Sequence, residues 1–363
     1  MFSTTNYIVI YTIVAILALA QNLFFEKMSI SPVSRKENLL RSIGVVRSES
    51  KWIFILKNIG IVLLIILLVY FCVTRPANSW DYMQYERMYD SGIGSIEESY
   101  FMIAALTPSF VILLAVYAIF SVTIHIVAIK WISLGFWVSI FVYLSKTFVL
   151  HDLYQIREGA CAALFLLSIP FLVKKRAIFF LIIIVGSFLH SSSLLLLPFG
   201  FMSSKKINKP LYIFFIIISF ILVSLDMNVK PLVSFIAHLP ILDRYSDKLG
   251  QSFYIQGDLG ITNFVTVFFA ILLVYSVEKF QGVYKYGIIV VKVFAMYVIS
   301  RPLLWGIPLG GRVVELYSVI EIFAIPLFVF IYSWQKHPIL FCLPFAYYIY
   351  YFFTRISPLL YSL

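Results

Sequence analysis

Charged residues are scarce in this chain of 363 residues: they make up 12% of it, with 17 acidic and 28 basic side chains. Globular domains usually carry about a quarter charged residues and about half apolar ones. Here hydrophobic residues reach 62%, and the mean hydropathy is +0.97. A soluble domain of this length cannot bury so much apolar surface. The composition therefore excludes that class and predicts an integral membrane protein.

Motifs for metal and nucleotide chemistry are also missing. The three cysteines, Cys72, Cys161 and Cys342, lie in or beside apolar runs without the spacing of a metal site, and we interpret them as small core residues. No phosphate-cradling P-loop and no GxSxG elbow occurs, so we expect neither metal nor cofactor. The net charge of +11 invites a nucleic-acid partner. We expect none, because the basic residues sit between apolar runs, where they set topology and meet lipid headgroups.

Apolar runs of about 20 residues, the length that crosses a hydrocarbon core, recur along the whole chain. Such spans must be helical, because lipid offers no hydrogen-bond partner to exposed backbone. We expect an all-α polytopic membrane protein that forms one transmembrane domain over residues 1–363. It has about 10 full spans, at 7–25, 52–73, 107–129, 131–150, 157–173, 210–226, 261–278, 284–300, 313–332 and 338–353. The first run lacks the features of a cleaved signal peptide. No internal repeat is visible, which disfavours inverted-repeat transporter folds.

The bias of lysine and arginine in the loops predicts the orientation. Segment 26–51 is rich in both and is placed in the cytoplasm, so that 74–100 and 227–260 become outer loops. The longer of the two is either a lid on the membrane surface or a passive amphipathic connector.

Segment 177–203 leaves two alternatives for the chain that follows it. As one span, it sends Lys205, Lys206 and Lys209 outward. As a hairpin of two short helices around His190, it returns them to the cytoplasm. The charge bias favours the hairpin.

This topology collects on the outer side a set of charged side chains, and arginines there oppose the positive-inside rule, which makes them candidates for function. The set is Arg75, Asp81, Arg87, His151, Arg157, His190, Arg244, Arg301 and Arg312. Arg157 stands at the outer entry to a span, where a guanidinium and backbone amides can hold a phosphate or pyrophosphate. The alternative is an ion pair with Asp152 or Glu158.

Arg312 is a second candidate for pyrophosphate binding. It follows Gly310-Gly311, and adjacent glycines let backbone approach a ligand closely. The alternative is an ion pair with Glu315. Arg75 and Arg301 are further candidates for the same role.

The first large outer loop places Asp81 among aromatic residues. Aromatic rings pack on sugar faces, while a carboxylate accepts protons from sugar hydroxyls. We take Trp80, Tyr82 and Tyr154 as candidate sugar-binding residues. The alternative is a solvated surface loop.

His190 lies beside a run of serines inside an otherwise apolar segment. Polar groups in lipid are costly and usually line a cavity or carry chemistry. Imidazole changes protonation near neutral pH, which makes His190 the candidate catalytic base, with Asp81 as the other candidate. The alternative for His190 is a hydrogen-bonded histidine inside the helix bundle.

The order of these motifs resembles the EpsG family of bacterial polysaccharide polymerases, the Wzy-type enzymes of O-antigen, capsule and exopolysaccharide assembly. The resemblance extends from Arg75 to about Pro326 and rests on Arg75-Pro76, Asp81-Tyr82, Gln155-Ile156-Arg157-Glu158-Gly159-Ala160, Leu189-His190-Ser191-Ser192 and Gly311-Arg312. Glu158 departs from the pattern, because the family's Q-I-R-Q motif has glutamine there.

The resemblance implies a GT-C-like glycosyltransferase of the bacterial inner membrane, acting at the periplasmic face on undecaprenyl-pyrophosphate-linked oligosaccharides. In that role Arg157 and Arg312 neutralise the leaving pyrophosphate without a metal, and His190 accepts the proton of the acceptor hydroxyl. A Wzz-type chain-length co-polymerase is an expected partner, besides membrane lipid. The alternatives are a flippase or transporter of the same lipid-linked sugars, an O-antigen ligase, and a purely structural membrane subunit.

Overall fold

The computed structural model describes residues 4–27, 51–77, 79–94, 97–224, 261–281, 283–304 and 308–361. Within these ranges the regular elements are helices and no strand occurs, which confirms the expected all-α class. The first half contains α1 (Thr4–Lys27), α3 (Lys51–Val73), α4 (Trp80–Ser91), α5 (Glu98–Ala105), α6 (Phe110–Ile132), α7 (Phe136–Val142), the π-helix η1 (Tyr143–Tyr154) and α8 (Ile156–Lys174). The second half contains α9 (Arg176–Leu189), the 3₁₀ helix η2 (Ser191–Phe201), α10 (Lys209–Ser224), α13 (Ile261–Tyr275), the 3₁₀ turn η4 (Val277–Lys279), α14 (Gly287–Leu303), α15 (Pro308–Ser318), α16 (Glu321–Ile331), α17 (Pro338–Tyr351), the π-helix η5 (Phe352–Ile356) and α18 (Ser357–Tyr361).

The number of full spans is smaller than the sequence suggested. Among the described residues, 5 stretches are long and apolar enough to cross a membrane: Thr4–Gln21, Phe110–Ile132, Phe136–Tyr154, Ile156–Lys174 and Pro338–Leu360. The pair Gly310–Ser318 and Glu321–Ile331, bent by 47°, makes a sixth if it counts as one span. The prediction of about 10 full spans is therefore wrong. Apolar runs continue through helix ends that hydropathy does not reveal: α10, α13 and α14, each expected as a full span, have only 16, 15 and 17 residues.

The chain reverses direction at His190, as the hairpin alternative predicted. His190 has an extended backbone (φ −157°, ψ 125°) between α9 and η2. The two arms then pack side by side: an Arg176 guanidinium N–H donates to the Met202 carbonyl at 2.9 Å, and the Ser193 hydroxyl donates to the Ile183 carbonyl at 3.0 Å. Close packing requires a glycine near the end of η2, because a Cβ on Gly200 would overlap the Phe180 ring.

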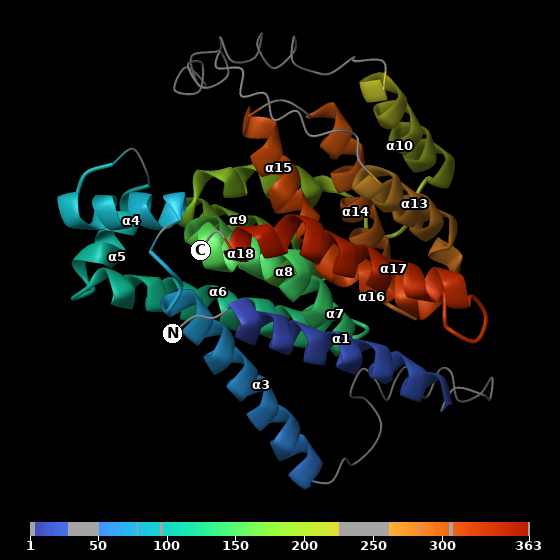
Figure 1. Cartoon of the computed structure of the whole chain (residues 1–363). Helices are drawn as coiled ribbons and strands as arrows, with labels where there is room; N and C mark the ends of the chain where they lie inside the picture. The colour runs from blue at the N-terminus through green and yellow to red at the C-terminus, as the bar shows by residue number, and fades with distance from the viewer. Residues whose placement is uncertain are drawn as a thin grey trace.

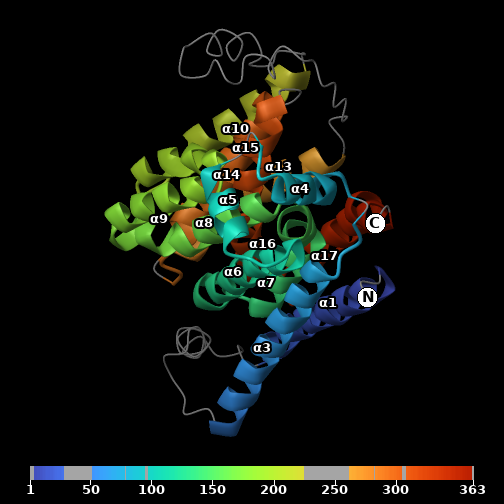
Figure 2. The same ribbon diagram turned by 90° about the vertical axis from the view of Figure 1, so that its left-hand side faces the viewer.

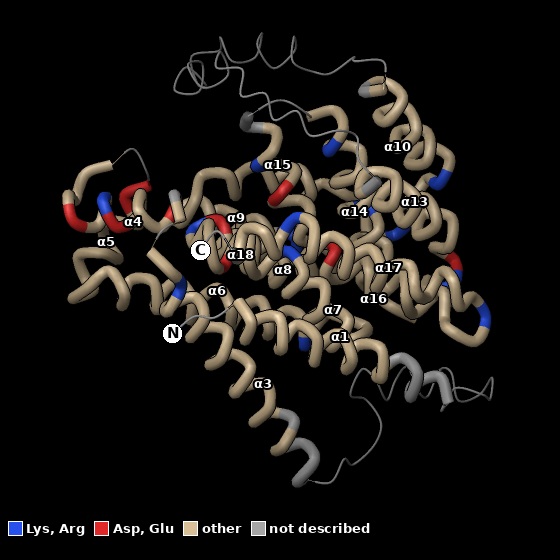
Figure 3. Tube along the Cα trace, viewed as in Figure 1, with Lys and Arg blue, Asp and Glu red and all other residues tan. Residues whose placement is uncertain are grey.

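Basic residues that follow the hairpin meet the turn between α13 and α14. The Lys209 ammonium donates to the Tyr275 carbonyl at 3.1 Å and pairs with Glu278 at 2.6 Å. The Lys292 ammonium donates to the Ser203 carbonyl. These contacts place the end of the hairpin and the α13–α14 turn at the same end of the bundle, opposite His190; Figure 3 marks the charged residues along the trace.

Helix α8 lies at the centre of the fold, where it packs against α6, α9 and η1 (Figure 1). Helices α4 and α5 lie together at one end of the bundle, and Figure 2 shows that end from the front. Local signals bound α4: the Ser79 side chain caps its N-terminus by accepting from the Tyr82 amide, and Gly92 ends it at a positive φ of 65°. This end of the bundle carries most of the candidate residues.

Candidate functional site

Three segments far apart in sequence meet at the carboxylate of Glu97. This residue directly precedes α5, Arg157 lies in the first turn of α8, and His190 lies at the break between α9 and η2. One Glu97 oxygen forms an ion pair with Arg157. The other lies 3.0 Å from His190 Nδ1 and accepts the Ser191 amide N–H at 2.7 Å. These residues are called the Glu97 cluster below, and they bring the predicted base and a predicted phosphate ligand onto one carboxylate.

The charge of Glu97 determines which nitrogen of His190 carries the proton. Burial raises the pKa of Glu97, but hydrogen bonds from His190 and the Ser191 amide, together with the charge of Arg157, hold that pKa well below its ordinary range. Glu97 is therefore ionised at neutral pH, and a carboxylate only accepts hydrogen bonds. Nδ1 must then donate, which leaves the lone pair on Nε2. Among the described residues Nε2 has no hydrogen-bond partner, so it can take a proton from a bound ligand.

Arg157 is held on several sides at the start of α8. It is 8% exposed, and its guanidinium carbon lies 5.6 Å from the centre of the Tyr85 ring. The helix approaches η1 closely at Gly159, where a Cβ would lie 2.9 Å from an Asp152 side-chain oxygen. The sequence alternatives paired Arg157 with Asp152 or Glu158, but the structure pairs it with Glu97, directly before α5.

Arg75 is a buried arginine without an ion-pair partner in the described part of the chain. It is 5% exposed, one guanidinium N–H donates to the Leu153 carbonyl, and the group lies 5.4 Å from the centre of the Tyr82 ring. Its Nε and second terminal nitrogen have no hydrogen-bond partner. An uncompensated buried cation is costly, so these donors suit an anionic ligand. The Tyr82 ring packs beside Arg75, and its role in sugar binding stays a prediction.

Asp81 lies in the first turn of α4, near the same arginines. Burial raises its pKa, while the positive charges of Arg312, Arg75 and Arg157 act in the opposite direction. Arg312 is exposed on α15, so its guanidinium is open to a ligand. Glu158 is only 2% exposed, and neither of its carboxylate oxygens has a hydrogen-bond partner among the described residues. The candidates Asp81, Arg75, Arg157 and Arg312 thus share one electrostatic environment.

Other predicted residues lie elsewhere or beyond reach. Among the described residues, Arg301 donates only to hydroxyls of α13 and α14, and it belongs to a separate pocket. The Tyr154 hydroxyl donates to the Leu359 carbonyl at 2.7 Å, which ties it to the C-terminal segment. The side chain of Trp80, loop 227–260 and Arg244 within it lie outside the described residues.

Asp152 anchors the end of η1 behind the site. It is 1% exposed and accepts hydrogen bonds from the hydroxyls of Ser121 and Tyr143, and His125 Nδ1 lies 3.3 Å from it. The next residue, Leu153, offers its carbonyl to Arg75. Asp152 therefore positions the backbone on which the phosphate candidates rest.

Sequence reasoning missed Glu97 and the anchor at Asp152. The one available signal for Glu97 was the adjacent acidic pair Glu97-Glu98 in an outer loop, and nothing in that pattern connects it with Arg157, 60 positions away. In the described ranges, no group of three or more His, Cys, Asp or Glu residues is placed to hold a metal ion.

Comparison with known proteins identifies a family. The model of the EpsG family matches residues 58–361, which include the Glu97 cluster, Arg75, Asp81 and Arg312. No curated protein and no solved structure matches the chain.

Proposed function

Because the chain belongs to the EpsG family of exopolysaccharide and O-antigen polymerase-like proteins, we propose that it is a glycosyltransferase that polymerises undecaprenyl-pyrophosphate-linked oligosaccharide repeat units at the periplasmic face of the bacterial inner membrane. The family supports a membrane-embedded, polysaccharide polymerase-type protein. The observation that carries the finer proposal is the carboxylate of Glu97, which orients His190 and holds Arg157 at the same point.

In the proposed reaction, the acceptor hydroxyl of an incoming repeat unit attacks the anomeric carbon of the growing chain. A bond forms between the hydroxyl oxygen and that carbon, and the bond from the carbon to the diphosphate oxygen breaks with inversion. The hydroxyl proton passes to His190 Nε2, and the electron pair leaves with undecaprenyl diphosphate. Glu97 stabilises the resulting imidazolium and fixes the ring orientation.

The departing diphosphate needs positive charge and hydrogen-bond donors. Arg75 supplies buried donors that no described residue uses, and Arg312 supplies an exposed guanidinium. Arg157 contributes less net charge than the sequence alone suggested, because Glu97 balances it. We propose that Arg157 lies between the catalytic base and the diphosphate and contacts the latter. Asp81 binds the acceptor sugar or, as the alternative, is itself the catalytic base.

A ladder assay tests this proposal. Purified protein given lipid-linked repeat units should form longer chains without nucleotide sugar or ATP. We expect His190→Ala and Arg157→Ala to abolish the ladder with expression intact, and His337→Ala, at the opposite end of the bundle, to leave it unchanged. Unchanged ladders in both site variants reject the site. Flipping of the substrate without a ladder identifies a flippase, and transfer only to a different acceptor lipid identifies a ligase.

The orientation requires a separate test. We expect a thiol reagent that cannot cross the membrane to label Ser192→Cys from outside and to reach Lys206→Cys only after permeabilisation. Ser192 lies at the start of η2, and Lys206 lies beyond the other end of that helix. Labelling of Lys206→Cys from outside contradicts the proposed orientation.

A further inference from the structure

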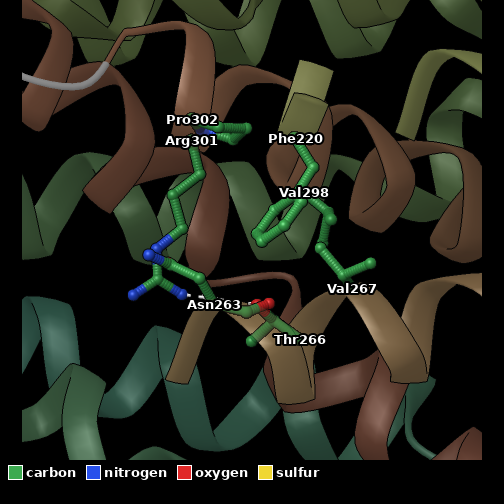
Figure 4. Close-up of a pocket in the computed structure, with 7 residues that line it drawn as sticks. All are labelled: Phe220, Asn263, Thr266, Val267, Val298, Arg301 and Pro302. Atoms are coloured by element: carbon green, nitrogen blue, oxygen red, sulfur yellow. Dashed lines mark hydrogen bonds between the residues drawn. The ribbon is translucent and has the colours of Figure 1, made fainter. Parts of the chain in front are cut away.

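A small pocket away from the Glu97 cluster contains an arginine without a carboxylate partner. The pocket lies between α10, α13 and α14, and Figure 4 shows Arg301 directed toward Asn263 and Thr266 within it. The Arg301 guanidinium donates to the Tyr297 hydroxyl at 3.2 Å and to the hydroxyls of Thr266 and Thr262 at 3.4 Å each. These long hydrogen bonds to neutral groups leave its charge uncompensated.

The described carboxylates act on Arg301 only from beyond ion-pair distance. Glu321 acts on it electrostatically, but one oxygen of that carboxylate lies 3.0 Å from the Lys146 ammonium, and the other has no hydrogen-bond partner among the described residues. No described carboxylate forms an ion pair with Arg301. A half-buried guanidinium without an ion-pair partner favours an anion as its ligand.

The pocket also presents an acceptor that nothing in the described structure satisfies. Asn263 is 6% exposed, and its side-chain oxygen has no hydrogen-bond partner. A buried acceptor of this kind costs free energy unless a ligand donates to it. The pocket thus combines donors for an anion with an acceptor for a hydroxyl or an N–H group.

The remaining walls of the pocket are apolar, and two of the three helices that carry them, α10 and α13, expose large apolar side chains on the surface of the bundle. Phe220, Val267 and Val298 line it. On the same helices, large apolar side chains such as Phe214 of α10 and Phe264 of α13 are exposed, each by more than half. A ligand with an apolar chain can therefore enter from the hydrocarbon side, which a free inorganic ion has no reason to do.

We propose that Arg301, Asn263, Thr262 and Thr266 form a second site that binds the phosphate of a lipid whose headgroup also carries a hydroxyl or an amine. The guanidinium and the Thr262 hydroxyl bind the phosphate oxygens. The Thr266 hydroxyl, which donates to the carbonyls of Thr262 and Asn263 at 3.0 Å each, supports the guanidinium, and the headgroup donor satisfies Asn263. Both a bilayer phospholipid and a lipid-linked sugar diphosphate have this chemistry. The site does not depend on the proposed polymerase activity, because it is defined by binding alone.

Native mass spectrometry of the full-length protein released from detergent tests the site with two probes, phosphatidylglycerol and undecaprenyl-diphospho-N-acetylglucosamine. We expect Arg301→Gln to weaken binding of at least one probe by tenfold or more. The control is Arg355→Gln, which replaces an exposed arginine of η5 and for which we expect no change. Tighter binding of the lipid-linked sugar assigns the pocket to a substrate, and tighter binding of phosphatidylglycerol assigns it to the bilayer. Equal binding of both probes by wild type and Arg301→Gln overturns the proposal.

A second variant distinguishes a loss of lipid binding from a loss of folding. Asn263→Asp places a carboxylate beside Arg301 and supplies the missing ion pair from within the protein. We expect this variant to lose the same lipid binding while its thermal unfolding temperature stays equal to or above that of the wild type. Retained lipid binding in Asn263→Asp contradicts the site, since an occupied guanidinium cannot also serve the phosphate.

Discussion

Replacing Glu97 by glutamine tests the central interaction of the site with almost no change in shape. The wild-type carboxylate accepts from His190 Nδ1 and the Ser191 amide and pairs with Arg157. An amide has one accepting and one donating arm. If its oxygen stays on His190, its NH₂ group opposes the Arg157 donors. If it turns over, its NH₂ group faces Nδ1, and the ring proton must move to Nε2, which can then no longer act as a base.

Either arrangement damages the proposed reaction. Loss of a positioned general base typically costs about 10²–10⁴-fold in rate, so we expect kcat of Glu97→Gln to fall at least 100-fold, in the range of ~10²–10⁴. The cluster also contributes to stability. Charge-assisted hydrogen bonds contribute about 1.5–3 kcal/mol each, and at 19% exposure we expect the variant to lose an amount near ~2 kcal/mol.

The pH dependence of stability tests the contribution of Glu97 independently of activity. The folded pKa of Glu97 lies below its ordinary value of 4.5. Its contribution to the free energy of unfolding is therefore complete above about pH 4.5 and is lost as the pH falls from there toward the folded pKa. We expect the stability difference between wild type and Glu97→Gln to shrink over that acidic range, as measured by thermal unfolding in detergent.

The matched control for this experiment is the neighbouring acid. Glu98 is exposed, and we expect Glu98→Gln to retain the wild-type ladder and stability. Glu97→Asp keeps the charge on a shorter arm, and we expect it to retain partial activity. Full activity of Glu97→Gln, or equal losses in Glu97→Gln and Glu98→Gln, refutes the assignment of Glu97.

Three further predictions concern the surroundings of the site. Asp152→Asn removes the charge that faces buried His125, and we expect it to lower the free energy of unfolding by about 3 kcal/mol, measured by chemical denaturation. Gly159→Ala forces a Cβ against Asp152 at 2.9 Å; we expect a loss of about 1–3 kcal/mol and a raised KM, because the first turn of α8 with Arg157 must shift. Arg75→Lys keeps the charge but loses the planar fork, and we expect KM for the lipid-linked donor to rise about tenfold or more while the thermal unfolding temperature changes little; an unchanged KM contradicts the role of Arg75 in diphosphate binding.

Several features of the site could be predicted from local sequence. His190 and Arg157 were identified because each is a polar or charged group that interrupts an apolar pattern, and that conflict is visible in a window of a few residues. The reversal at His190 followed from counting lysines on either side of one segment, and the contact between Arg176 and Met202 confirms it. Family membership followed from the order of short motifs, and the family match over 58–361 confirms it.

Features that depend on pairing could not be predicted in this way. Glu97 is one acidic residue among several in its loop, and only the packing of α5 against α9 and α6 selects it as the partner of His190 and Arg157. Arg301 looked equivalent to the other outward arginines, but α13 and α14 hold it in a pocket of its own. The predicted number of spans was wrong for a related reason: an apolar run does not show where a helix bends or ends.

By itself the sequence determined that this is a helical membrane protein whose apolar segments are interrupted by arginines and by the imidazole of His190. These properties follow from the composition and from the charge along the chain, because each segment's preference for lipid or water depends on its own residues. Only the tertiary structure decided which carboxylate balances which cation, and therefore which arginines stay free for phosphate. The physical reason is that an ion pair depends on distances between side chains on different helices, and those distances are set by packing rather than by position in the sequence.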